Sequence, residues 1–480
     1  MRERVAYGDW QTPVELARRV VELVRGHRPA AVLEPTCGSG VFLEVAARAF
    51  PCAALHGLDV SAAHVRAARR RLPRDRAVVE VADFFATDWL RLLAQLPDPL
   101  MILGNPPWVT NSTLGALRSG NLPAKRTARH QAGLDALTGA SNFDISEWML
   151  LRLLEAARPR AFTLAMLCKA SVARRVMEHA AAERWRLQGE TRVIDARQYF
   201  AANVDAVLLH IRGGGRTRPS ARWPVYSSLE AARPSRAMGV VDGRTYSDLD
   251  SYRRTRRLEG TSTVAWRSGL KHDCARVMEL AIAGGTLRNG LGEPVPRDPD
   301  YVFPLLKGSD LANGRVEPRR YVIVTQRRLG DDTSALQTRA PALWRYLQGH
   351  RAQLAARRSR IYRDRPEFAM FGVGDYSFAP YKVAVCGLYK RFTFTVVRPV
   401  EGQPVMLDDT SYFVACATEV EATTLATALN GPDAREFFEA RVFWDAKRPI
   451  TKALLQTLSL ETLLRNDART RRVREERGDA

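Results

Sequence analysis

Apolar runs and amphipathic stretches alternate along the first 215 residues of the chain. The short apolar runs predict buried strands at Ala31–Glu34, Ala54–Val60, Ala77–Ala82, Leu100–Gly104, Ala161–Cys168, Arg192–Ala196 and Val204–Ile211. Helical periodicity predicts helices at Pro13–Val24, Gly40–Ala49, Ser61–Arg71, Ile145–Ala157 and Ala170–Ala182. Such alternation is typical of a doubly wound α/β domain, in which ligands bind at the carboxyl ends of the strands.

The pattern changes after residue 215, and it predicts four regions. They are an α/β domain (1–215), a linker rich in Arg and Pro (216–240), a mixed α+β domain (241–465) and a charged, flexible tail (466–480). Strands of the second domain are expected at Val302–Leu306, Tyr321–Thr325, Tyr381–Leu388, Phe392–Val397 and Ser411–Cys416, with helices near Pro341–Arg358 and Val420–Asn430.

Positive charge is concentrated in the second domain. The chain of 480 residues has a net charge of +21, and residues 251–400 hold 27 Lys and Arg against 13 Asp and Glu, or +14. A polyanion such as nucleic acid is the expected partner, and the alternative is solvated surface charge. Six arginines lie between residues 351 and 365, where they could bind phosphates or form a solvated helix face.

Cysteine spacing and hydropathy exclude several classes of protein. The six cysteines are scattered and form no Cys-x-x-Cys pair, which argues against zinc fingers and disulfide frameworks, and no metal is expected. No stretch is long and apolar enough to span a membrane, and the N-terminus lacks the apolar core of a signal peptide. We therefore expect a cytoplasmic protein.

A glycine-bearing turn follows the first predicted strand. Glu34, Pro35 and Cys37 precede Gly38 and Gly40, and a helix is expected to start there. Glycines let the backbone approach a ligand closely, and a helix N-terminus favours a carboxylate or phosphate. A bare Gly-x-Gly is weak support, because tight turns between strand and helix are common.

Acidic residues at the next two strand ends strengthen this prediction. Asp59 ends the second strand, where a carboxylate can accept from ribose hydroxyls. Asp83 follows the third strand, where it can accept from an adenine amino group while Phe84 covers the ring. The alternative is a solvated sheet edge, and a nucleoside pocket is favoured.

The segment Asn105-Pro106-Pro107-Trp108 follows the fourth strand. Each proline fixes φ and removes a backbone donor, so the carbonyls before and between the prolines point outward. Acceptors beside a flat ring suit the exocyclic amino group of a planar base. The alternative is a Pro-Pro turn that ends a core strand.

Taken in order, these motifs resemble the class I S-adenosylmethionine-dependent methyltransferases, and most closely the gamma-class, TaqI-like adenine-N6 DNA methyltransferases. The resemblance covers about residues 6–465. It extends to Gln11-Thr12-Pro13, to Asn142-Phe143-Asp144 with Leu164–Lys169, to Tyr199–Val207 and, more loosely, to Val302–Leu311 and Phe443–Leu463. Trp108 stands where Tyr is commonest in this family, so stacking is kept and a phenol hydroxyl is lost.

The resemblance implies a Rossmann-like domain with a mostly parallel seven-stranded sheet, followed by an α+β DNA-recognition domain. It also implies site-specific transfer of a methyl group from S-adenosyl-L-methionine to the N6 amino group of an adenine flipped out of double-stranded DNA. Expected cofactor contacts come from Thr12, Pro13, Glu34, Pro35, Cys37, Gly38, Gly40, Asp59, Asp83, Phe84 and Asn105. Asn105, Pro106, Pro107 and Trp108 form the expected catalytic set, and Trp108 and Phe200 are expected to stack on the target base.

DNA contacts are expected from basic residues of both domains. Those selected are Lys125, Arg126, Arg357, Arg358, Arg360, Lys382, Lys447 and Arg448. A monomer is expected, with a separate restriction endonuclease or defence-system subunit as its partner. Three alternatives remain: a methyltransferase acting on RNA, one acting on a protein glutamine, or a catalytically inactive DNA-specificity subunit. The target sequence and the biological role, whether restriction–modification, phage defence or regulation, cannot be read from the chain.

Overall fold

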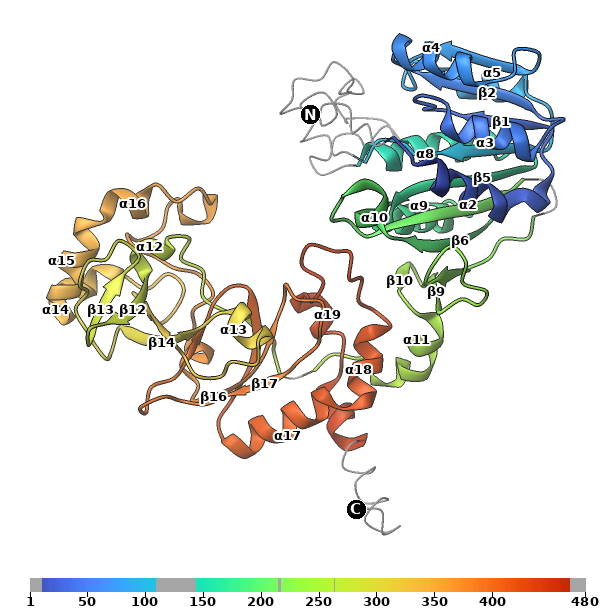
Figure 1. The fold of residues 1–480 in the computed structure, drawn as a ribbon. Coiled ribbons are helices and arrows are strands. Elements are labelled where there is room, and N and C mark those ends of the chain that lie inside the picture. Colours follow the sequence, from blue (N-terminus) through green and yellow to red (C-terminus); the bar gives the residue numbers. More distant parts are fainter. Residues whose placement is uncertain (1–10, 109–143, 215–216, 263, 467–480) are drawn as a thin grey trace. The chain divides into compact units, whose positions relative to one another are not determined.

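The computed structural model describes residues 11–108, 144–214, 217–262 and 264–466. The chain forms two compact units, Met1–Asp250 and Ser251–Ala480, which are described separately below (Figure 1). The basic residues Lys125 and Arg126, and residues 467–480 of the expected tail, lie outside the described residues.

The first unit is built on one ten-stranded sheet. Its strands are β1 (Ala31–Glu34), β2 (Ala54–Asp59), β3 (Ala77–Val81), β4 (Leu100–Gly104), β5 (Phe162–Lys169), β6 (Leu187–Ile194), β7 (Ala206–Gly213), β8 (Arg222–Tyr226), β9 (Arg236–Val241) and β10 (Arg244–Tyr246). Their order is β10-β9-β8-β6-β7-β5-β4-β1-β2-β3. Strands β1 to β5 pair in parallel, and β7 runs antiparallel between β5 and β6. The seven predicted strands are present, and three further strands extend the sheet.

The predicted linker at residues 216–240 was wrong. Strand β8 and most of β9 fall within it, and β8 pairs with β6 in parallel. The Trp223 side chain is only 2% exposed. A Cβ added to Gly189 on β6 would lie 2.5 Å from the Trp223 ring, so the glycine makes room for the indole. The Arg and Pro residues around Trp223 and Val225 suggested a linker, although buried and less buried residues alternate there as in a strand. The first unit continues to Asp250.

Helices cover both faces of this sheet, as expected for a doubly wound domain. They are α2 (Val14–Val24), α3 (Val41–Ala49), α4 (Ala62–Arg71), α5 (Trp89–Ala94), α8 (Ile145–Ala157), α9 (Ala170–Ala182) and α10 (Ala196–Phe200). Side chains of α5, α8 and α9 pack with Ile102 in one core, whereas α2, α3, α4 and α10 pack with Leu103 in the other. Successive residues of β4 thus point into opposite cores, which explains the unbroken apolar run that predicted this strand.

The second unit contains two smaller sheets. One has the order β11-β19-β16-β17 and the other β13-β12-β15-β14-β18. These strands are β11 (Arg267–Ser268), β12 (Glu279–Ala283), β13 (Thr286–Asn289), β14 (Val302–Leu306), β15 (Arg320–Ile323), β16 (Tyr381–Cys386), β17 (Thr395–Val397), β18 (Met406–Leu407) and β19 (Ser411–Cys416). The helices are α11 (Leu249–Thr255, which begins in the first unit), α12 (Ala275–Met278), α13 (Gly308–Ala312), α14 (Leu336–Arg339), α15 (Pro341–Gly349), α16 (Arg351–Ala355), α17 (Glu419–Asn430), α18 (Pro432–Glu439) and α19 (Lys452–Leu455).

The long helix predicted near Pro341–Arg358 is two short helices. The chain breaks at His350, whose φ of −110° is not helical. Its ring nitrogens lie 2.9 Å from the Tyr346 carbonyl and 2.6 Å from the Glu293 carboxylate. Helix α16 then ends at Ala355, so the arginines that follow do not lie on an α-helix.

Within the described ranges, no helix is long and apolar enough to cross a membrane. The same residues contain no group of three or more His, Cys, Asp and Glu side chains that could hold a metal ion.

Candidate active site

The parallel strands β1 to β5 bring the predicted site residues to one edge of the sheet. Glu34 ends β1 and Asp59 ends β2. Asp83 follows β3 by two residues, and Asn105 directly follows β4. Because the carboxyl ends of parallel strands meet at the same edge, residues separated by more than 70 positions in sequence share one site.

The turn after β1 needs its glycines. Gly38 and Gly40 have φ values of +49° and +81°, which other residues adopt only with strain. A Cβ at Gly40 would lie 2.8 Å from the Ala68 Cβ on α4. The Cys37 N–H donates to the Leu58 carbonyl at 2.7 Å, which ties the turn to β2. Pro35 and Cys37 are buried, and burial raises the pKa of the Cys37 thiol, so it is not a reactive thiolate.

Asp59 holds this turn in place. One of its carboxylate oxygens accepts from the Gly38 N–H at 2.8 Å. The other accepts from the Ser61 N–H at 2.8 Å and lies 3.3 Å from His64 Nδ1. The side chain is 11% exposed. A carboxylate has about four acceptor positions, so Asp59 keeps about one for a ligand.

Glu34 is a buried carboxyl group at the centre of the site. It is 3% exposed, and among the described residues its Oε2 atom has no hydrogen-bond partner. Burial raises the pKa of Glu34 well above its usual range, and the nearby Asp59 carboxylate raises it further. The Leu43 N–H opposes this shift by hydrogen bonding. An unpaired buried polar atom costs about 1–3 kcal/mol of stability, so such atoms usually have a partner. A bound ligand can provide that partner here.

The N-terminal segment covers the glycine turn. A Cβ added to Gly38 would lie 3.1 Å from Gln11 Nε2, and Ser39 Oγ donates to Gln11 Oε1 at 3.1 Å. Thr12 is half-buried, and Pro13 is the N-cap of α2. Gln11 was not among the predicted site residues, although the predicted residues Thr12 and Pro13 directly follow it.

Asp83 and Phe84 differ in accessibility. Asp83 is exposed, and its side chain accepts from the Phe85 N–H at 2.9 Å. The Phe84 ring packs 4.4 Å from the Trp89 ring and is 5% exposed, so it belongs to the core. Phe85, which was not predicted, is half-buried and lies 5.2 Å from the Trp148 ring. It is a second aromatic candidate at this strand end.

The segment after β4 is packed tightly. Gly104 has a φ of +149°, Pro106 is buried, and Asn105 and Pro107 are half-buried. Trp108 is 6% exposed, and its Nε1 donates to the Leu167 carbonyl at 3.4 Å. The motif is thus anchored to β5 as well as to β4.

Trp108 and Phe200 come together, but not as the expected sandwich. Their ring centroids lie 5.2 Å apart at an interplanar angle of 73°, which is an edge-to-face contact. Phe200, at the end of α10, is 5% exposed. Two rings that hold a base between them lie about 7 Å apart, twice a contact distance of about 3.5 Å. A base can enter between these rings only if they separate.

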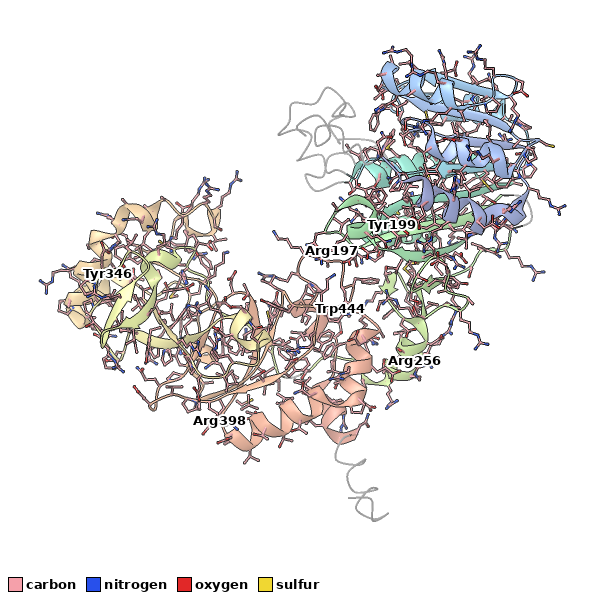
Figure 2. The ribbon with its side chains drawn as sticks, in the orientation of Figure 1. Arg197, Tyr199, Arg256, Tyr346, Arg398 and Trp444 are labelled. Atoms are coloured by element: carbon pink, nitrogen blue, oxygen red, sulfur yellow. The ribbon has the colours of Figure 1, made fainter. Side chains whose placement is uncertain are left out.

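Sequence reasoning missed two ionic contacts near this edge. Lys169, which ends β5, pairs with the buried Asp144 at 2.8 Å. Arg19 on α2 pairs with Glu230 and contacts the Tyr199 hydroxyl on α10, the helix that also carries the labelled Arg197 (Figure 2). Each pair joins residues 25 or more positions apart, so local patterns cannot reveal it.

The basic residues selected for DNA contact fall into three groups. Lys382 is 1% exposed and donates to the Ala379 carbonyl, so this prediction was wrong, whereas Arg357 is half-buried and its DNA contact stays a prediction. Arg448 is half-buried and bonds the Asp409 carbonyl at 3.2 Å. Exposed positions are occupied by Arg358, Arg360 and Lys447.

Comparison with known proteins gave a clear relative and a structural neighbour. The chain is 40% identical over 471 residues to the type II methyltransferase M.NspV of Nostoc sp., and the match covers 96% of this chain and 98% of that protein. The structure of the type IIL restriction-modification enzyme MmeI, solved in complex with DNA, matches with a TM-score of 0.55 at 12% identity. That match covers 92% of this chain and 64% of the MmeI chain, and it shows the fold. No family model matches the chain.

Proposed function

We propose that this chain, which belongs to the type II methyltransferase family, methylates the N6 amino group of adenine in double-stranded DNA. The observation that carries the proposal is the position of Asn105-Pro106-Pro107-Trp108 at the same strand edge as the glycine turn and the buried Glu34 carboxyl group. The methyl donor is S-adenosyl-L-methionine, and the subclass is the gamma, TaqI-like class.

The residues at this edge fit such a donor. Glu34 Oε2 is a buried atom that forms no hydrogen bond with any residue the structure describes, and it offers a site for the donor's amino group. The turn at Gly38 and Gly40 leaves no Cβ between the backbone and a ligand. Asp59 and Asp83 supply acceptors for ribose hydroxyls and for an adenine amino group. When bound, S-adenosyl-L-methionine supplies an electrophilic methyl group.

The residues after β4 orient the acceptor base. The Asn105 side-chain oxygen and the Pro106 carbonyl accept the two hydrogens of the target amino group. This contact directs the nitrogen lone pair away from the two acceptors and stabilises the positive charge that develops on nitrogen. Orientation and electrostatics therefore provide most of the rate enhancement, without a covalent enzyme intermediate.

The target adenine must leave the DNA stack, which costs a few kcal/mol. Stacking against an aromatic ring contributes about 1–3 kcal/mol per base. Because Trp108 contacts Phe200 directly and both rings are buried, a base can stack between them only when the two rings separate. The edge-to-face contact therefore changes when DNA binds.

The second unit is the proposed target-recognition domain, acting in the cytoplasm on duplex DNA. The role is host-DNA modification within a restriction–modification or phage-defence system, with the nuclease on a separate chain and the methyltransferase acting as a monomer.

Transfer of a labelled methyl group to mixed-sequence duplex DNA, followed by nucleoside mass spectrometry, tests the proposal. N6-methyladenine is the expected product. Label in cytosine, RNA or protein would contradict the assignment of the substrate. Binding of S-adenosylmethionine without transfer to any DNA would favour an inactive specificity subunit.

A further inference from the structure

The segment that follows α16 is irregular and rich in arginine. Residues 356–365, here called the arginine loop, contain one short 3-10 turn at Arg360–Tyr362 and no α-helix. The prediction left open whether these arginines form a solvated helix face, and that alternative is excluded. We propose that the arginine loop binds the phosphate backbone of DNA, an inference that rests on the proposed function.

Two inward-facing side chains fix the backbone of the loop. The Arg357 guanidinium stacks 3.7 Å from the Tyr362 ring centroid and donates to the Leu354 and Ala369 carbonyls, each at 2.7 Å. The Tyr362 hydroxyl donates to the Lys271 carbonyl at 3.2 Å, and its ring lies 5.4 Å from the Phe371 ring. The loop is therefore tied to its surroundings from both ends.

The ends of the arginine loop are also joined. Arg351, at the start of α16, forms an ion pair with Glu367. Together with the bond from Arg357 to Ala369, this pair brings the residues before and after the loop together. A loop ordered in advance loses less conformational entropy when it binds a ligand.

Four arginines of the loop face solvent. Arg358, Arg360, Arg363 and Arg365 are exposed, and Asp364 is the only carboxylate between positions 358 and 365. The net charge of these eight positions is therefore four minus one, or +3. Among the described residues, none of the four arginines forms an ion pair with a carboxylate.

Several exposed arginines elsewhere in this unit are neutralised in pairs. Arg254 pairs with Glu436 at 2.6 Å, Arg297 with Glu401 at 3.1 Å, and Arg398 (labelled in Figure 2) with Glu419 at 2.6 Å. Their side chains are 54–63% exposed, so pairing rather than burial distinguishes them from the arginine loop. These three arginines are matched controls for a test of local contact.

The surface beside the loop is concave. Gln353, Ala356, Arg358 and Ser359 line an open hollow with Arg357 and Asp273. The Asp273 carboxylate is paired with Lys271 at 2.9 Å, which offsets its repulsion of an anion. A planar guanidinium can donate two parallel N–H bonds to two phosphate oxygens, so Arg358, which lines the hollow, suits a phosphate there. Phosphates recur along a nucleic-acid strand, so several exposed arginines on one loop can contact successive phosphates.

Fluorescence anisotropy of a labelled 30-base-pair mixed-sequence duplex, titrated with full-length protein at several salt concentrations, tests this inference. The triple variant Arg358→Ala, Arg360→Ala, Arg363→Ala loses up to three phosphate contacts. At 0.1 M salt, each contact contributes about tenfold in affinity through release of about 0.9 counterion, so a loss of roughly 100- to 1,000-fold is expected. The slope of log affinity against log salt should fall by about 2–3.

The control variant Arg254→Ala, Arg297→Ala, Arg398→Ala removes the same number of positive charges. Its affinity should stay within about threefold of wild type, since distant surface charges are screened. Equal losses in the two triple variants would overturn the inference. Should the loop variant fail to fold, Arg360→Glu alone, at an exposed position, should still weaken binding at least tenfold, and unchanged binding would contradict the inference.

Methyl transfer measured on the same proteins separates the two proposals. If wild-type protein methylates DNA while both triple variants bind it with equal affinity, the inference about the arginine loop is wrong and the proposed function stands. If wild-type protein neither binds nor methylates duplex DNA, both are wrong. Transfer by the loop variant that recovers at saturating DNA supports both.

Discussion

Replacing Glu34 with Gln separates the stability of the site from its function. The carboxyl group is buried, its Oε2 has no partner within the described part of the chain, and its pKa is raised well above the usual range by burial and by Asp59. A carboxyl group with a raised folded-state pKa keeps its proton longer in the folded protein than in the unfolded chain. Stability from this group is therefore fully present below the unfolded pKa of about 4.3 and is lost as pH rises toward the folded pKa.

Glu34→Gln keeps the shape of the side chain and cannot ionise. The variant should match wild type near pH 4 and exceed it at pH 8.5 by about 1–3 kcal/mol, the cost of an uncompensated buried polar group. For a unit of about 250 residues this corresponds to roughly 2–10 °C in melting temperature. Calorimetry of the ligand-free protein at both pH values measures the difference.

The same variant should bind S-adenosylmethionine more weakly. Loss of a hydrogen bond to a charged group costs about 1.5–3 kcal/mol, or roughly 10- to 100-fold in affinity, as measured by isothermal titration. A variant that gains stability and loses affinity for S-adenosylmethionine supports the assignment of Glu34 as a cofactor contact. The reasoning would be refuted by a variant whose stability difference from wild type is the same at both pH values, or whose cofactor affinity is unchanged.

Substitutions at three further positions test other contacts. Trp108→Ala should lower the unfolding free energy by about 3–5 kcal/mol because the indole is buried, whereas Trp108→Phe should lose only about 1 kcal/mol and keep most of the methyl transfer; thermal melts paired with transfer assays check this. Lys382→Met should stabilise the protein at pH 7 by about 1–4 kcal/mol, because burial lowers the lysine pKa to about 7. The gain should shrink toward pH 10, as measured by denaturant unfolding at both pH values. A gain that is the same at both pH values would contradict this. Arg357→Ala should destabilise the second unit by about 2–4 kcal/mol through loss of its carbonyl bonds and its stacking on Tyr362, and hydrogen exchange around residues 356–371 should rise.

The strands of the first unit could be predicted because their apolar runs are local signals. Runs such as Leu100–Gly104 are buried on both faces of a parallel sheet, so no polar residue interrupts them. Strand β8 could not be predicted, because its burial depends on contact between Trp223 and Gly189 on β6. Only the tertiary structure brings those two residues together.

The residue types of the candidate site could be predicted, but their packing could not. Glu34, Asp59 and Asn105 reach one edge because each follows a parallel strand. The edge-to-face contact of Trp108 with Phe200 depends on residues 92 positions apart. Lys382 is preceded by a tyrosine and followed by apolar residues, yet composition alone suggested a surface cation rather than a buried one.

The most direct test of the account compares Asn105→Ala with wild type in single-turnover methyl transfer to duplex DNA, with cofactor affinity measured on the same samples. We expect a rate at least about 100-fold lower, as for removal of one charge-stabilising hydrogen-bond acceptor or donor, with S-adenosylmethionine affinity within a few fold of wild type. Transfer retained within about tenfold of wild type would contradict the assignment of Asn105 as the residue that orients the target amino group.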